Sequence, residues 1–277
     1  SATQQVPLGR VAEMLVDLPF HLGQRGTEFL HHAAHGLAVG DAAVQLLHPG
    51  FERLRVGTAP HLVDTLRADR LGCYGFRGIE TPHIDAVAAE GVLFEQATST
   101  VPLTLPSHSS IFTGLIPPKH GVRDNGGFFV EKATATLAER LKDGGYATGA
   151  FVGAWVLDSR WGLDQGFDHY SDRFDLSKYK VVNLGTVQKK GDEVMDLALG
   201  WLEGVKAKRF FAWVHLYDPH TPYEPPEPFL SRYRGQRYLG EVAYTDQVVG
   251  RLVSWLKGAG VWDRTILVLL ADHGESL

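Results

Sequence analysis

The stretch Thr265-Ile-Leu-Val-Leu-Leu-Ala-Asp272-His273-Gly-Glu275 holds the two features on which the fold prediction rests. An apolar run without alternation leads directly into a carboxylate and an imidazole. Such a run predicts a strand that is buried on both faces, as in a parallel sheet covered by helices. Ligands of these sheets bind beyond the carboxyl ends of the strands, so Asp272 and His273 are a candidate half-site for a divalent metal. A capping aspartate followed by an incidental histidine is the alternative interpretation of this pair taken alone.

A second apolar run of the same character, residues 210–216, leads into Asp218 and His220. Two buried strands that each end in Asp and His predict a shared site at one edge of the sheet. Further strands are predicted at 92–97 and 148–152. Amphipathic helices are predicted at 84–90, 107–113, 133–143, 187–205 and 241–257. This alternation predicts a sheet covered by helices on both faces.

Residues 102–114 place the hydroxyl of Thr104 just ahead of the helix start at Pro106, Ser107 and His108. Proline and serine are common in the first turn of a helix. A hydroxyl at that point faces unpaired backbone N–H groups and the positive end of the helix dipole, which favours an alkoxide nucleophile and binds an oxyanion. A threonine that only caps the helix is the alternative interpretation.

Composition limits the function classes. The 277 residues suffice for one large α/β domain or two small ones. Lysine and arginine number 27 against 32 acidic residues, a net charge of −5 without blocks of like charge, so no nucleic-acid partner is expected. The basic pair Lys189-Lys190 is interpreted as a solvated helix face. No stretch reaches the ~18 apolar residues of a membrane span, so the chain as written is predicted to be soluble. The location of a longer parent, exported or membrane-anchored, stays open.

Short motifs along the chain resemble, in their order, the catalytic domain of the sulfatase branch of the alkaline phosphatase superfamily. The resemblance covers roughly three quarters of the chain. The motifs lie at 64–75, 81–85, 90–94, 104–114, 120–122, 145–148, 162–170, 210–222 and 271–275. The resemblance and the strand pattern together predict an α/β fold, namely a three-layer α/β/α sandwich with a mixed, largely parallel sheet.

The resemblance implies a divalent cation, of zinc, manganese or calcium, held by Asp64, Asp272 and His273. It also implies that Thr104 is the nucleophile, because a cation beside the hydroxyl would lower its pKa and offset charge on the transferred group. His220 resembles the active-site histidine of the family, and it would protonate the leaving alcohol or bind an oxygen of the transferred group.

His108, one turn into the helix that begins near Thr104, is expected either to approach the transferred group or to brace the loop. The resemblance favours a catalytic role for it. The substrate implied by the family is a phosphate or sulfate ester of a small molecule, a glycan or a lipid.

This chain departs from the sulfatase pattern at the nucleophile. Sulfatases carry the pattern Cys/Ser-x-Pro-Ser-Arg at this position and convert its first residue to formylglycine. Thr104 cannot be converted, because its β-carbon carries a methyl group. Thr104-Leu-Pro-Ser-His108 is similar to the nucleotide pyrophosphatase/phosphodiesterase branch, in which threonine attacks phosphorus. Gly153-Ala154 also stands where arylsulfatases have Gly-Lys. Both departures favour phosphate esters, with a sulfatase that needs no formylglycine as the rival.

The ends of the chain depart from the family as well. Residues 1–60 contain no Lys, Ile, Asn, Tyr or Trp but five histidines, and Pro60 leaves only Leu62 and Val63 in place of a first strand. The chain also ends soon after His273. We therefore predict an unassigned segment 1–60 that is foreign to the fold, and a sulfatase-like domain 61–277 that is incomplete at its C-terminus. The rival function is a catalytically incomplete fragment or pseudoenzyme that binds anionic glycans or lipids.

Overall fold

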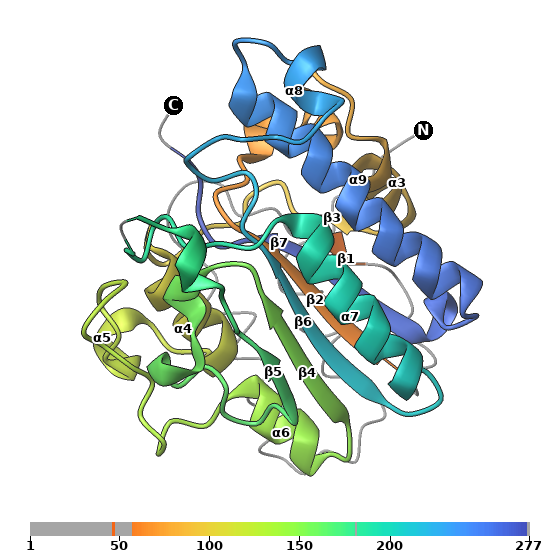
Figure 1. The fold of residues 1–277 in the computed structure, drawn as a ribbon. Helices are drawn as coiled ribbons and strands as arrows, with labels where there is room; N and C mark the ends of the chain where they lie inside the picture. The colour runs from red at the N-terminus through yellow and green to blue at the C-terminus, as the bar shows by residue number, and fades with distance from the viewer. Residues whose placement is uncertain (1–45, 48–56, 181, 276–277) are drawn as a thin grey trace.

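Seven strands form a single sheet in the order β3-β1-β7-β2-β6-β4-β5 (Figure 1). The computed structural model describes residues 46–47, 57–180 and 182–275. Pairs among β2, β4, β5, β6 and β7 are parallel, and only β1 pairs antiparallel, with β3 and β7. The mixed, largely parallel sheet is thereby confirmed. The strands are β1 Leu46–Leu47, β2 Gly57–Val63, β3 Val92–Leu93, β4 Ala147–Val152, β5 His169–Ser171, β6 Phe210–Leu216 and β7 Thr265–Ala271.

Side chains along β6 alternate between two hydrophobic cores, which makes the fold a three-layer sandwich. Phe210, Ala212, Val214 and Leu216 face the core that includes residues of α3, α7 and α9. The intervening Phe211 and Trp213 face the core that includes residues of α4 and α6. Figure 1 shows α7 and α9 crossing in front of the strands. The described helices are α3 Pro82–Glu90, α4 Thr104–Thr113, α5 Pro117–His120, α6 Leu137–Asp143, α7 Gly191–Val205, α8 Phe229–Arg232 and α9 Arg237–Gly258.

Most predicted elements are present with shifted ends. The predicted strand 210–216 matches β6, but 92–97 is reduced to the two residues of β3, and the short strand β5 was not predicted. The helix predicted from 133 begins at Leu137, because Thr136 and Glu139 form a capping box there. Weak helical periodicity at residues 11–20 lies outside the described residues. A second such stretch, 28–47, ends in β1, which is a strand.

The expectation that the first strand is missing is wrong. β2 runs from Gly57 to Val63 in the middle of the sheet and includes Pro60. Its pairing with β7 is continuous, whereas its pairing with β6 skips Ala59 and Pro60. In a parallel sheet a residue directs its N–H to one neighbour only, so the missing donor of proline interrupts one ladder and leaves the other intact. Residues 57–60 and β1, inside the segment predicted to be foreign, thus belong to the sheet.

The interpretation of Lys189-Lys190 as a solvated helix face is wrong too. Lys189 is 5% exposed, and its ammonium donates to the carbonyls of Val152 and Ser171. Lys190 precedes α7 and lies 3.3 Å from Asp218 and 3.6 Å from Glu241. Both lysines therefore bind interior groups, and α7 begins only at Gly191.

Glu241 predicts a pH dependence of stability. Burial, and then the charge of Asp218, raise its pKa to about 8. The unfolded chain ionises Glu241 near pH 4.5, so unfolding releases a proton between these values, and the free energy of unfolding falls as pH rises from about 4.5 to 8. The slope of this contribution is at most about 1.4 kcal/mol per pH unit. Glu241→Gln keeps an oxygen for the Glu224 amide, which bonds Glu241 at 2.7 Å.

Glu241→Gln should therefore flatten the decline in urea unfolding experiments across this pH range. Glu203→Gln, at an exposed position on α7, is the matched control and should keep it. An unchanged slope in Glu241→Gln would contradict the assignment.

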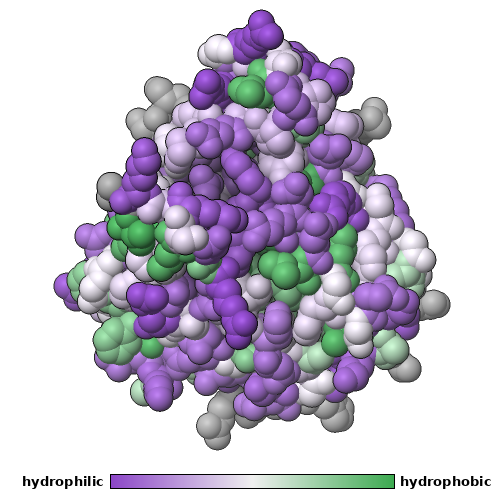
Figure 2. All heavy atoms as spheres, in the orientation of Figure 1, coloured by the Kyte–Doolittle hydropathy of each residue, from purple (hydrophilic) through white to green (hydrophobic). Residues whose placement is uncertain are grey.

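Among the described residues, none of the helices is long and apolar enough to cross a bilayer. Hydrophilic residues predominate on the face in Figure 2, and hydrophobic residues form small separate groups there. Scattered apolar residues of this kind are ordinary on protein surfaces.

Candidate metal centre and active site

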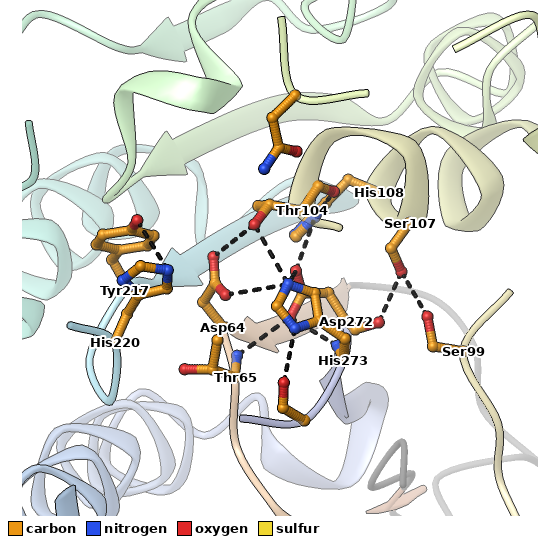
Figure 3. A network of polar contacts seen from close by, with 12 residues as sticks. Asp64, Thr65, Ser99, Thr104, Ser107, His108, Tyr217, His220, Asp272 and His273 are labelled. Carbon is orange, nitrogen blue, oxygen red and sulfur yellow. Dashed lines mark hydrogen bonds and ion pairs between the residues drawn. The ribbon is translucent and has the colours of Figure 1, made fainter. Parts of the chain in front are cut away.

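Three segments that are distant in sequence meet at the carboxyl edge of the sheet (Figure 3). Asp64 follows β2, Asp272 and His273 follow β7, and Thr104 opens α4. The hydroxyl of Thr104 donates to Asp64 Oδ2 at 3.3 Å and lies 3.4 Å from His273 Nε2. The four residues predicted as nucleophile and metal ligands are thus brought together.

The chemistry of the donor set fits a divalent cation. One ligand atom each from Asp64, Asp272 and His273 lie within 4.8 Å of one another. Asp64 Oδ1 and Asp272 Oδ2 are buried without a hydrogen-bond partner, although buried carboxylate oxygens are normally paired or bound to metal. His273 Nδ1 donates to the Gly274 carbonyl at 2.8 Å, which leaves Nε2 free to bind metal. Two carboxylates and one imidazole suit zinc or manganese.

Thr104 does not cap its helix. It is the first residue of α4 and follows the N-cap residue Leu103, so its side chain is free to turn to Asp64 and His273. The next amide, of Leu105, is bound at 2.9 Å by the side chain of Asn125, a residue that sequence reasoning missed. Thr104 is only 3% exposed. The helix start therefore presents Thr104 toward the carboxylates, as a nucleophile requires.

Thr65, the residue after Asp64, does not point into the candidate metal site. Its φ of 51° is unusual for a β-branched residue, and such strain persists where neighbouring contacts impose it. Its amide donates to Asp272 Oδ1, its hydroxyl donates to the Pro219 carbonyl, and its carbonyl accepts from Tyr238. Thr65 thus orients one metal carboxylate and ties β2 to the loop after β6.

His108 is fully buried, behind Asp272. Its Nδ1 donates to the Thr104 carbonyl at 2.8 Å and lies 3.6 Å from Asp272 Oδ2. Its ring packs against Trp213 and His215. Burial lowers the pKa of both His108 and His215 to about 4, so both imidazoles are neutral near pH 7. Of the two roles left open for His108, bracing matches this position better than contact with a substrate.

His220 lies outside this cluster. Its ring stacks on Tyr217 with centroids 4.2 Å apart, and its Nε2 is 3.1 Å from the Tyr217 hydroxyl. Nδ1 donates to the Thr221 carbonyl. Figure 3 shows the pair beside Asp64, on the side away from Asp272. Its neighbour Asp218, predicted at the same edge, instead accepts from the first amide of α7, at Gly191, and anchors that helix.

The carboxylates make the centre strongly anionic without a cation. Burial, and then the charge of Asp64, raise the pKa of Asp272. Burial lowers the pKa of His273, but Asp272 and Asp64 outweigh it and the net shift is upward. Negative charges gathered in a buried site are what a bound cation would compensate.

Comparisons with known proteins agree with the fold. Residues 62–277 match the family model described as Sulfatase. The chain is 29% identical over 257 residues to the ulvan-active sulfatase of Formosa agariphila, covering 78% of this chain and 50% of that protein. It is also 27% identical over 214 residues to the uncharacterized sulfatase YidJ of Escherichia coli, covering 67% of this chain and 43% of that protein. The chain thus spans about half the length of the curated relatives it matches.

A solved structure similar to this chain is phosphonate monoester hydrolase of Agrobacterium radiobacter. It superposes with a TM-score of 0.68 at 19% identity, over 80% of this chain and 63% of that chain. At that identity the likeness establishes the fold. The family match covers most of the chain, and the fold agrees with it. This chain therefore belongs to the sulfatase family.

Proposed function

We propose that this domain hydrolyses phosphate or sulfate esters, with Thr104 as the nucleophile and a divalent cation held by Asp64, Asp272 and His273. The observation that carries the proposal is the position of the Thr104 hydroxyl, 3.3 Å from Asp64 and 3.4 Å from His273, at the start of a helix. A cation bound there supplies a lower hydroxyl pKa and compensates negative charge on the transferred group.

Residues of the chain carry out the attack and the protonation of the leaving group. Thr104 Oγ1 attacks the phosphorus or sulfur atom, and Asp64 Oδ2 accepts its hydrogen bond beforehand. His220, held against Tyr217 and in its doubly protonated form, protonates the leaving alcohol as the bond from that alcohol to phosphorus or sulfur breaks, or it binds an oxygen of the transferred group. Water then hydrolyses the threonine ester to regenerate the hydroxyl.

We favour phosphate esters over sulfate esters. The site lacks the lysine that arylsulfatases carry at the position of Ala154, which is 0% exposed here. The preceding Gly153 packs so closely that a β-carbon on it would lie 3.0 Å from the His215 carbonyl. Ala154 thus denies the transferred group a cationic side chain. The names of the similar proteins include a sulfatase and a phosphonate hydrolase, so both ester classes are tested.

The test is turnover of nitrophenyl phosphate, bis-nitrophenyl phosphate and nitrophenyl sulfate with added zinc, manganese or calcium. We expect phosphoester turnover that depends on zinc or manganese. Faster turnover of the sulfate would favour the rival, a sulfatase that needs no formylglycine.

A module that only binds anionic glycans or lipids is the other rival. A competent centre should retain nearly one cation per chain after purification. Absence of both metal and turnover would contradict the hydrolase proposal and favour the binding module.

A further inference from the structure

His215 is a polar residue inside β6, a strand that is buried along its whole length. All seven residues of β6 are buried, and six of them are apolar. His215 is 0% exposed, and neither of its ring nitrogens has a hydrogen-bond partner. An apolar side chain would fill this position without leaving polar atoms unpaired. The position therefore points to a use for the imidazole beyond packing.

The ring of His215 faces the back of the candidate metal centre. Its Nε2 lies 3.6 Å from Asp64 Oδ2, the same oxygen that accepts from Thr104. The other oxygen, Oδ1, is 3.7 Å from His273 Nε2. The edge of the His215 ring packs on His108, with centroids 4.9 Å apart, and His108 in turn lies behind Asp272. Two buried imidazoles thus lie behind the two carboxylates, one for each.

We propose that His215 is a positioning residue whose Nε2–H, 3.6 Å from Asp64 Oδ2, orients that carboxylate electrostatically, so that Oδ1 is presented to the cation with Asp272 and His273. The inference rests on the metal site of the proposed function. Partners of this kind fix the orientation of a ligand carboxylate and typically change metal affinity or activity 10- to 100-fold when they are removed. They also explain a buried imidazole that would otherwise only destabilise the chain.

The test is metal titration of three variants of the purified chain, monitored by calorimetry and by the visible spectrum of bound cobalt. His215→Leu removes both ring nitrogens at similar volume. We expect its metal affinity to fall about 10- to 100-fold and its cobalt spectrum to change. Without metal we expect it to melt above the wild type, because two unpaired buried nitrogens are gone. A merely structural role would instead lower both stability and affinity.

His215→Gln restores an N–H donor near the position of Nε2, and it should recover most of the lost affinity. Trp213→Phe is the matched control, since Trp213 lies on the same face of β6 and also packs against His108. It should bind metal like the wild type.

Four outcomes would overturn the inference. Wild-type affinity in His215→Leu would show that Asp64 needs no such partner. A loss of affinity in Trp213→Phe equal to that in His215→Leu would assign the effect to packing. Two cations per wild-type chain, with one lost in His215→Leu, would make His215 a ligand. A wild-type chain that binds no metal would overturn the proposed function as well, so the two failures are distinguishable.

Discussion

Thr104→Ala is expected to lower kcat by ~10⁴–10⁶-fold while the protein stays folded and binds its cation. Loss of the nucleophile removes the covalent route, and losses of this size are typical when a nucleophile is deleted. The hydroxyl bonds Asp64 and His273 rather than capping α4, so its removal should cost little stability. Turnover of bis-nitrophenyl phosphate, metal content and thermal melting measure the three parts of this prediction.

Thr104→Ser is the matched variant, because it keeps the hydroxyl at the start of α4. It should retain a substantial part of the activity. Turnover by Thr104→Ala within tenfold of the wild type would rule out Thr104 as the nucleophile and leave a cation-bound water as the attacking group.

Asp272→Asn is expected to abolish metal retention and to lower kcat at least ~10³-fold, yet to raise the melting temperature of the metal-free protein. Asp272 Oδ1 accepts from the amides of Thr65 and His273, and asparagine keeps that oxygen. The amide nitrogen of asparagine replaces the unpartnered Oδ2, which lies 3.4 Å from His273 Nε2. The substitution also removes one of two buried negative charges that repel each other. The usual stabilisation of the folded state by added metal should vanish.

Calorimetric scans with and without zinc or manganese, beside metal analysis, measure this prediction. Asp168→Asn is the control: Asp168 forms an exposed ion pair with Lys142 at 2.7 Å, so its loss should change stability little and leave metal binding intact. Metal-dependent stabilisation that survives in Asp272→Asn would mean that the cation binds elsewhere.

The sequence predicted correctly those strands whose apolar run is continuous along the chain. The predicted bounds of β6 agree with the structure because its apolar run is continuous, and β7 extends only one residue further. The start of α6 was placed too early, because a capping box at Thr136 overrides the apolar periodicity before it. Pro60 misled the prediction because sequence cannot show which neighbouring strand a missing N–H would have served.

Within the candidate site, Asp272 and His273 were predicted from the strand that precedes them, since parallel strands carry their carboxyl ends to one edge of a sheet, whereas Asp64 and the grouping with Thr104 came from the resemblance to the sulfatase family. The sequence was not enough for His215, which reads as part of an apolar strand, or for Lys190, which reads as a surface residue. Their surroundings come from β2 and the N-terminal part of α9, many residues away.

The sequence by itself determined the α/β class and the strands β6 and β7, because these depend on local apolar runs, and its motifs pointed to the four residues of the candidate centre through their resemblance to the sulfatase family. Only the tertiary structure decided that Asp218 anchors α7 rather than joining the centre, and that two buried imidazoles lie behind the metal carboxylates. The physical reason is that burial and hydrogen-bond partners belong to the packed assembly of segments. Neither can be assigned to a residue from its neighbours in the chain alone.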